Sequence, residues 1–238
     1  MKSVYRYEYL HPDELREIIV NHPIAYVPLG SLEWHGRHLP LGNDAIKVYE
    51  ICLRAAERTG GVVFPPLFIG AECLKLRALH IMDGTVDVDY SIYRAFLSDY
   101  VRRVMKQGFR VIVLLTGHYS REQVAAVKAV ARECMEITKS VEAKGTPSVE
   151  IIALPEYELA LDLGYRGDHA AKWETSILLY LRPELVDFSK LRDLLGIDGE
   201  DPRETASREL GERVVNLIVE RLCRRVEEAL AKLGLEVL

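Results

Sequence analysis

The sequence predicts an α/β fold, a three-layer sandwich with a mainly parallel central sheet. Strand-like and helix-like segments alternate along the chain, which is the pattern of a parallel sheet covered by helices on both faces. Two segments, 24–30 and 110–115, carry apolar residues on both faces, as buried strands do. No repeat, low-complexity stretch or linker interrupts the pattern, so we expect a single domain over 1–238.

The first elements follow from apolar runs and from the residues that end them. The run 24–30 reads as a strand that ends at Gly30, and the apolar positions of 44–58 recur every three to four residues, as on one helix face. A short strand at 62–64 runs into two prolines, which cannot continue in a sheet interior. The segment 67–86 is expected to be a long loop.

The middle of the chain adds a second helix, a central strand and a third helix. Pairs of apolar residues recur along 88–106 as on one face of a helix, and 110–115 is the second strand that is apolar on both faces. The third helix begins at Ser120 as a capping box. In that motif the Ser120 hydroxyl accepts the backbone N–H of Gln123, and the Gln123 side chain reaches back to the backbone N–H of Ser120.

The last third continues the alternation. A strand is expected near 149–154 and a helix over 172–182, which stops before Pro183. Residues 187–203 have no periodicity and are expected to be irregular. A final helix over 204–233 carries an apolar stripe along one face.

Composition excludes several classes of protein. Lys and Arg number 31 against 36 Asp and Glu, a net charge of −5, which argues against a dedicated nucleic-acid binder. No apolar run approaches the roughly 20 residues of a membrane-spanning helix. The first residues have no apolar segment like that of a signal peptide, so a cytoplasmic protein is expected.

Cysteine and amide residues add two further expectations. The four cysteines, Cys52, Cys73, Cys134 and Cys223, form no C-x-x-C pair, which argues against a zinc knuckle or a disulfide framework. Three of them fall in helical patterns and are expected to be small buried side chains. Asn and Gln are scarce while Glu and Arg are abundant, a composition typical of a heat-loving source.

Side chains that can bind metals follow the predicted strands. The turns after 24–30, after 110–115 and after 149–154 carry carboxylates and imidazoles: Glu33, His35, His38, Asp44, His118, Asp168, His169 and Glu174. Because ligands bind outside the carboxyl ends of parallel strands, we expect these groups to meet at one sheet edge. Mixed carboxylate and imidazole ligands suit zinc, manganese or ferrous iron.

Each of these side chains also has a structural interpretation. Asp44 could cap the helix that it opens, His118 could hydrogen-bond a carbonyl, and Glu174 could be a solvated carboxylate in a first helical turn. Trp34 and Trp173 flank ligand candidates and could either pack or stack on a substrate. The joint placement of the carboxylates and imidazoles at strand ends favours the interpretation that they bind a metal ion.

Four stretches carry a resemblance to a known family. VPLGSLEWHGRHLPLGND, PPLFIG with the later Gly84-Thr85, GFRVIVLLTGHYS and DHAAKWETSILLYLRPELV together resemble the motifs of the creatininase family of metal-dependent amidohydrolases. The resemblance runs from about 23 to 186, and its first and last motifs are the specific ones. It implies a parallel α/β sandwich, often a hexamer, with one or two divalent ions at the strand ends.

The resemblance also implies roles for individual residues. It gives the metal ligands as Glu33, His35, Asp44 and His118, with Glu174 at the metal site or just outside it. It places His169 near the reacting carbonyl as the catalytic group, and we expect Trp34, Tyr119 and Tyr165 to contact the substrate. One ion is expected on Glu33, Asp44 and His118, and a second, weaker one on His35 and Asp44, with Asp44 bridging.

Departures from the family pattern argue against creatinine as the substrate. Ser120 stands where the creatinine-hydrolysing members have a metal-binding Glu, and Tyr165 stands where they have a tryptophan. Ala171 and Lys172 replace the usual Gly and Glu. We therefore expect hydrolysis of a non-peptide C–N bond in a linear or cyclic amide by a metal-activated water, on a small molecule other than creatinine.

Alternatives remain open at this level. Relatives deformylate a formamidopyrimidine nucleotide in flavin and deazaflavin biosynthesis or trim a small peptide, and basic residues for a phosphate lie on the candidate loops: Arg37, Lys75, Arg77, Arg121, Arg166 and Lys172. A non-enzymatic binding or scaffold protein on the same fold is an alternative of another class. The apolar segments 64–70 and 79–82 and the C-terminal helix predict a homo-oligomer, with a hexamer favoured by the resemblance.

Overall fold

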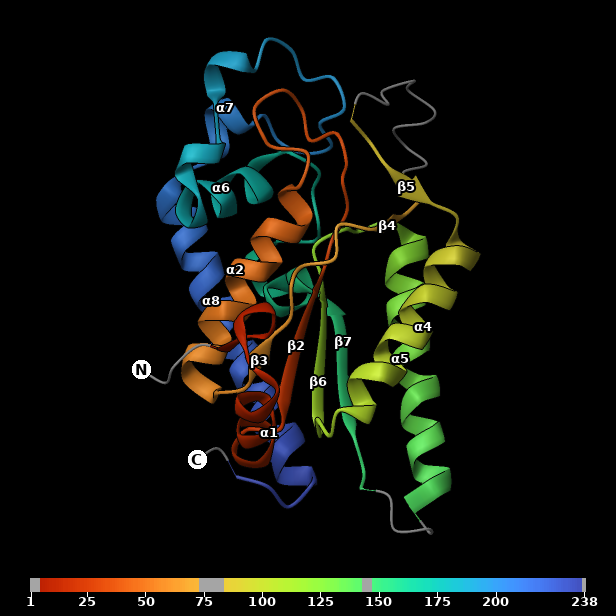
Figure 1. The fold of residues 1–238 in the computed structure, drawn as a ribbon. Helices are drawn as coiled ribbons and strands as arrows, with labels where there is room; N and C mark the ends of the chain where they lie inside the picture. Colours follow the sequence, from red (N-terminus) through yellow and green to blue (C-terminus); the bar gives the residue numbers. More distant parts are fainter. Residues whose placement is uncertain (1–4, 73–83, 143–146, 237–238) are drawn as a thin grey trace.

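A computed structural model describes residues 5–72, 84–142 and 147–236. Five parallel strands form the central sheet in the order β1-β3-β2-β6-β7 (Figure 1). Their bounds are Tyr5–Arg6 for β1, Ile24–Leu29 for β2, Val62–Val63 for β3, Val111–Thr116 for β6 and Glu150–Pro155 for β7. The α/β class with a mainly parallel sheet is therefore confirmed.

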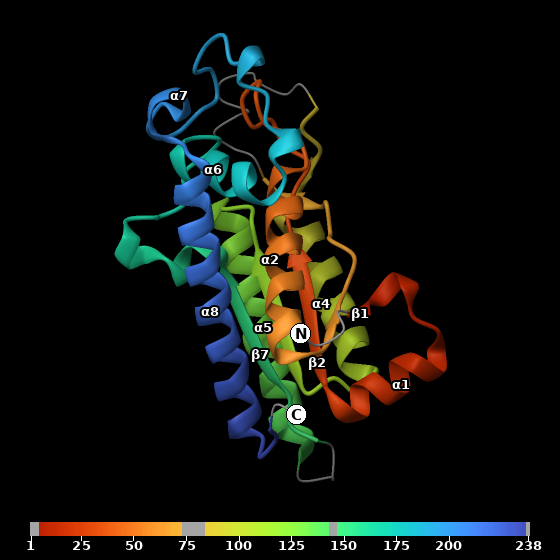
Figure 2. The same ribbon diagram turned by 90° about the vertical axis from the view of Figure 1, so that its left-hand side faces the viewer.

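Helices cover both faces of this sheet and give the three layers. One layer holds α2 (Asn43–Thr59), α6 (Lys172–Leu181) and α8 (Arg208–Lys232), and the other holds α4 (Tyr90–Lys106) and α5 (Arg121–Glu142) (Figure 1). Figure 2 shows α2 and α8 in front of the sheet and α4 and α5 behind it.

Shorter elements complete the described chain. They are α1 (Pro12–Asn21), α7 (Pro202–Thr205), a parallel pair of β4 (Gly70–Ala71) and β5 (Asp87–Val88), and the 3-10 turns Tyr7–Tyr9, Glu156–Leu159, Leu161–Leu163, Pro183–Leu185 and Phe188–Lys190.

The two apolar runs form adjacent strands in the middle of the sheet. All residues of β2 and β6 are buried, and Ile24 to Leu29 pair in register with Val111 to Thr116. Alternate side chains enter different cores, because successive residues of a strand point to opposite faces. Tyr26 lies in the core under α2 and α8, and Val27 lies in the core under α4 and α5.

Several boundaries differ from the sequence-based expectation. The strand β1 and the helix α1 were not predicted, because β1 is two residues long and α1 buries a single residue, Ile18. The helix expected over 204–233 is divided: α7 ends at Thr205, and Ser207 caps α8 by accepting the N–H of Leu210 at 3.1 Å. The loop expected over 67–86 includes β4, while residues 73–83 lie outside the described residues.

The capping box predicted at Ser120 is half right. Ser120 Oγ accepts the backbone N–H of Gln123 at 3.1 Å, as expected. The Gln123 side chain does not reach back to Ser120. Its Oε1 accepts the N–H of Ala71 in β4 at 2.8 Å and its Nε2 donates to Thr116 Oγ1 at the end of β6 at 2.9 Å, so the buried amide joins these two strands instead.

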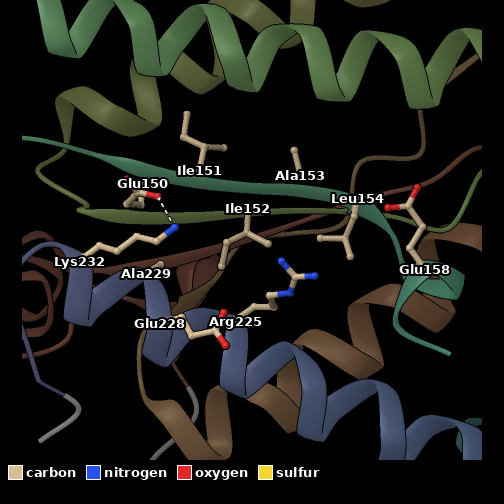
Figure 3. Close-up of a pocket in the computed structure, with 10 residues that line it drawn as sticks. All are labelled: Glu150, Ile151, Ile152, Ala153, Leu154, Glu158, Arg225, Glu228, Ala229 and Lys232. Carbon is tan, nitrogen blue, oxygen red and sulfur yellow. Dashed lines mark ion pairs between the residues drawn. The ribbon is translucent and has the colours of Figure 1, made fainter. Parts of the chain in front are cut away.

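A groove of about 260 Å³ runs between the edge strand β7 and helix α8 (Figure 3). Lys232 and Glu150, 3.7 Å apart, form an ion pair at one end of it. None of the candidate metal ligands lines this groove. Among the described helices, none combines the length and apolar character needed to cross a bilayer.

Candidate metal centre

The candidate ligands meet where β2 and β6 end. Two glycines, Gly30 and Gly117, follow these strands and let the first turn of α2 rest directly on them. A Cβ at Gly30 would lie 2.2 Å from the backbone N of Ala45, and one at Gly117 would lie 2.2 Å from the carbonyl O of Asp44. Gly117 is therefore required because the backbone of α2 approaches it closely.

Asp44 is the residue that this packing holds in place. The cap of α2 is Gly42, so Asp44 is not the helix cap. Its buried carboxylate accepts the Ser31 hydroxyl at 2.6 Å and faces two histidines.

One cluster consists of Glu33, Asp44 and His118. His118 Nδ1 lies 2.8 Å from Glu33 Oε2 and 3.2 Å from Asp44 Oδ2. His118 Nε2 is 3.1 Å from the carbonyl of Ala71, and because a carbonyl only accepts, this nitrogen donates. The hydrogen bond orients the ring so that Nδ1 points at the two carboxylates.

A second cluster consists of His35, Asp44 and Glu174. His35 Nε2 lies 2.8 Å from Asp44 Oδ1 and 3.5 Å from Glu174 Oε2. His35 Nδ1 donates to the carbonyl of Glu33 at 3.0 Å, which fixes the ring in the same way. In each cluster the potential ligand atoms lie within 4.8 Å of one another, and Asp44 belongs to both.

His169 lies beside the second cluster. Its ring centroid is 4.3 Å from that of His35, and its Nε2 donates to the carbonyl of Trp34 at 2.7 Å. Glu33, His35 and His169 form a third group with the spacing of a metal site. The structure therefore brings His169 to the edge of the centre, beside Glu33 and His35.

The donor set fits a divalent cation. His35 Nε2 and Asp44 Oδ1 are buried and lie 2.8 Å apart, and neither has a further hydrogen-bond partner among the described residues. Neutral imidazole nitrogens and carboxylate oxygens are ligands for zinc, manganese and iron. Both histidines donate one N–H to a backbone carbonyl, as metal-bound histidines do.

Charge explains the protonation of the centre when no ion is bound. Burial raises the pKa of Glu33, but the facing His118 outweighs it and lowers this pKa to about 2. Burial lowers the pKa of His35, but the carboxylates of Asp44 and Glu174 outweigh it and raise this pKa to about 9. A proton on His35 thus occupies the place that a bound cation would take.

Two histidine and carboxylate candidates have structural roles. His38 Nε2 is 2.9 Å from Thr175 Oγ1, and burial and the nearby His35 lower its pKa to about 4. Asp168 accepts the backbone N–H groups of Trp173 at 2.7 Å and Glu174 at 3.2 Å, so it caps the first turn of α6.

The three candidate substrate residues lie around the same end of the sheet. Trp34 is half-buried, and its indole donates to the carbonyl of Leu195 at 3.3 Å. Tyr119 lies 2.5 Å, oxygen to oxygen, from Tyr165, which is fully buried and stacks on Trp173 with centroids 5.4 Å apart.

Sequence analysis missed a buried lysine. Lys47 is fully buried, and its ammonium contacts Glu174, lies 3.3 Å from Glu156 Oε1 and donates to the Tyr119 hydroxyl at 2.8 Å. The signal was present, because Lys47 falls three residues after Asp44 and one before Val48, on the buried stripe of α2. A charged residue on such a stripe needs a buried partner.

Comparison with known proteins places the chain in a family. The family model described as creatinine amidohydrolase matches residues 8–200, so the chain belongs to the creatininase family. The creatinine amidohydrolase of Pseudomonas putida is 25% identical over 95% of this chain and 97% of its own length. A mycofactocin precursor peptide peptidase of Mycolicibacterium smegmatis is 28% identical over 78% of this chain and 71% of its own.

Solved structures agree with the fold. A putative creatinine amidohydrolase from Bacteroides fragilis superposes with a TM-score of 0.74 at 26% identity, covering 96% of this chain and 97% of that one. A manganese form of creatininase and a mutant of Zn–Zn type each give a TM-score of 0.73 at 23% identity, covering 95% of this chain and 98% of theirs. The resemblance seen in the motifs is thereby confirmed.

Proposed function

We propose that this chain is a metal-dependent amidohydrolase that cleaves a C–N bond in a small amide, with zinc, manganese or iron as its ion. The observation that carries the proposal is the pair of buried clusters that share Asp44, each with a histidine fixed by a backbone carbonyl. The zinc and manganese forms of similar structures support the choice of ion. The bound ion would polarise a carbonyl and lower the pKa of a water.

The chain's own residues supply positioning and proton transfer. Glu33, Asp44 and His118 would hold the ion, with His35 and Glu174 beside them. The His169 nitrogen that is not bonded to the Trp34 carbonyl would exchange a proton with the substrate, because Nε2 is committed to that carbonyl. A protonated His169 can then donate to the leaving nitrogen.

We propose a linear or cyclic amide other than creatinine as the substrate. Ser120 donates to the carbonyl of Ala71 at 2.5 Å and accepts from Gln123, so its hydroxyl has a structural role where the creatinine enzymes have a Glu. Tyr165 is buried against Trp173 where they have a tryptophan. Ser120 and Tyr165 therefore differ in chemistry from the residues of the creatinine-hydrolysing enzymes, which supports a different substrate.

A peptide bond is the second candidate. The mycofactocin peptidase relative covers 78% of this chain and supports it. For the nucleotide alternative, Arg37 already faces Asp193 at 3.6 Å and Lys172 faces Glu200 at 2.9 Å, so two of the basic side chains offered to a phosphate are paired.

The test is hydrolysis by the metal-loaded protein of a panel of formamides, lactams, cyclic ureas and short peptides. Turnover of one class, lost on chelation and restored by zinc or manganese, would support the proposal. Asp44→Asn keeps the shape of the side chain and removes the charge shared by both clusters, so metal content and turnover should fall together. Full metal content and activity in Asp44→Asn would refute the ligand assignment, and a wild-type protein without stoichiometric metal would favour the scaffold alternative.

A further inference from the structure

We propose that Lys47 acts as a built-in cation that weakens the second metal position, so that the protein holds one tightly bound ion per chain on Glu33, Asp44 and His118. The proposal rests on the proposed function, because it concerns the same centre. It assigns a function to a buried lysine that borders the second cluster through Asp44 and Glu174.

The two clusters differ in their neighbours. Lys47 contacts Glu174 and lies 3.7 Å from Asp44 Oδ1, so it borders two of the three members of the second cluster. On the first cluster it borders only the shared Asp44, and through the oxygen that faces His35 rather than the one that faces His118.

Lys47 is held as a cation by its surroundings. Its side chain is fully buried, and its ammonium has Glu174 and Glu156 as partners and donates to the Tyr119 hydroxyl. A buried lysine with this many acceptors is stabilised in its charged form, because each carboxylate favours the ammonium. The neighbouring Tyr119 ring, 4.3 Å from Nζ to its centroid, adds a cation–π contact.

Lys47 therefore already supplies a positive charge next to the second cluster. An ion in the first cluster would use the charges of Glu33 and Asp44, which leaves Glu174 as the remaining carboxylate of the second cluster. Lys47 neutralises that carboxylate through Oε1, while Oε2 accepts the N–H of Ala170 at 2.7 Å. A second divalent ion would have to bind next to a fixed positive charge in a site of low dielectric.

Metal counting tests the proposal directly. Metal-free protein is titrated with Mn²⁺, and free Mn²⁺ is followed by electron paramagnetic resonance. Wild-type protein should bind one Mn²⁺ per chain and a second one about 100-fold more weakly, since a unit charge within a few ångströms of a divalent ion has an effect of this order even with strong screening. In Lys47→Met the two affinities should come within about tenfold of each other.

Two further variants separate charge from folding. Lys47→Met combined with Glu156→Gln removes one buried charge of each sign, so the double variant should fold even if the single one is too unstable to study, and it too should bind two ions. Lys128→Met removes an ammonium that pairs with Glu158 at 2.6 Å on α5, and it should bind one ion as the wild type does.

The outcomes distinguish this proposal from the function on which it rests. Two ions of similar affinity in the wild type would overturn the role of Lys47 and leave the metal centre standing, as would one tightly bound ion in both folded Lys47 variants. Absence of Mn²⁺, Zn²⁺ and Fe²⁺ binding in every form would overturn the metal centre itself. An exchange-coupled signal that appears only in the Lys47 variants would support the proposal, because a purely structural role would not produce it.

Discussion

Gly117 offers the sharpest test of how the fold places the candidate ligands. In Gly117→Ala the new Cβ would lie 2.2 Å from the carbonyl O of Asp44, and ordinary contact begins at 3.4 Å. The gap must therefore open by 3.4 − 2.2 = 1.2 Å. The obstacle is backbone, so no side-chain rotation relieves it, and the first turn of α2 has to move away from β6 with Asp44 on it.

Both stability and metal binding should respond to that movement. Overpacking of this kind typically costs about 1–3 kcal/mol, so we expect a loss of about 2 kcal/mol in the free energy of unfolding. For a chain of this size that lowers the melting temperature by about 4–8 °C. A 1.2 Å displacement of Asp44 also exceeds the tolerance of about 0.5 Å within which a metal site keeps its geometry, so Mn²⁺ affinity should fall by more than tenfold.

Gly42→Ala is the matched control. Its Cβ would meet Phe68 Cε1 at 2.9 Å, which is the end of a side chain that can turn away. It also lies at the start of α2, so a general weakness of that helix would affect both variants. Thermal unfolding and Mn²⁺ titration should show little change in Gly42→Ala. A Gly117→Ala protein with wild-type melting temperature and Mn²⁺ affinity would refute the close-approach argument.

Four other predictions concern the ligands, the cap, pH and assembly. His169→Ala should keep its metal and lose about 10²–10⁴ in turnover, whereas His118→Ala should lose both; metal loss in His169→Ala would make His169 a ligand instead. Ser120→Ala should cost about 1 kcal/mol of unfolding free energy and little activity, and a collapse of activity at unchanged stability would contradict its role as a helix cap. Asp44 and Glu174 raise the pKa of His35 to about 9, so metal binding must displace a proton from His35 below that pH. Mn²⁺ affinity should therefore rise as the pH increases towards about 9, and calorimetry should detect a proton released to the buffer on binding. A pH-independent affinity would contradict this. The protein should be a homo-oligomer, with a hexamer expected, because two large apolar side chains are exposed: Val86, just before β5, is 61% exposed and Ile92, in α4, is 58% exposed. A monomer in light scattering at micromolar concentration would refute this prediction.

The sequence by itself determined the fold class and the chemistry at the strand ends. β2 and β6 are apolar on both faces, and that local pattern is enough to predict two strands near the middle of a parallel sheet. Once the strands are parallel, Glu33 and His118 must emerge at the same edge. Both facts depend on short stretches of chain, which is why they could be predicted without coordinates.

Tertiary structure decided how those groups are paired and balanced. Asp44 meets His118 across 74 positions of sequence, and Lys47 meets Glu174 across 127. No local pattern encodes such contacts, since they depend on how α2 and α6 pack over the strand ends. Lys47 illustrates the limit: its place on a buried stripe shows that it needs a partner, but burial with Glu156 and Glu174 is possible only because folding brings the three charges out of water together.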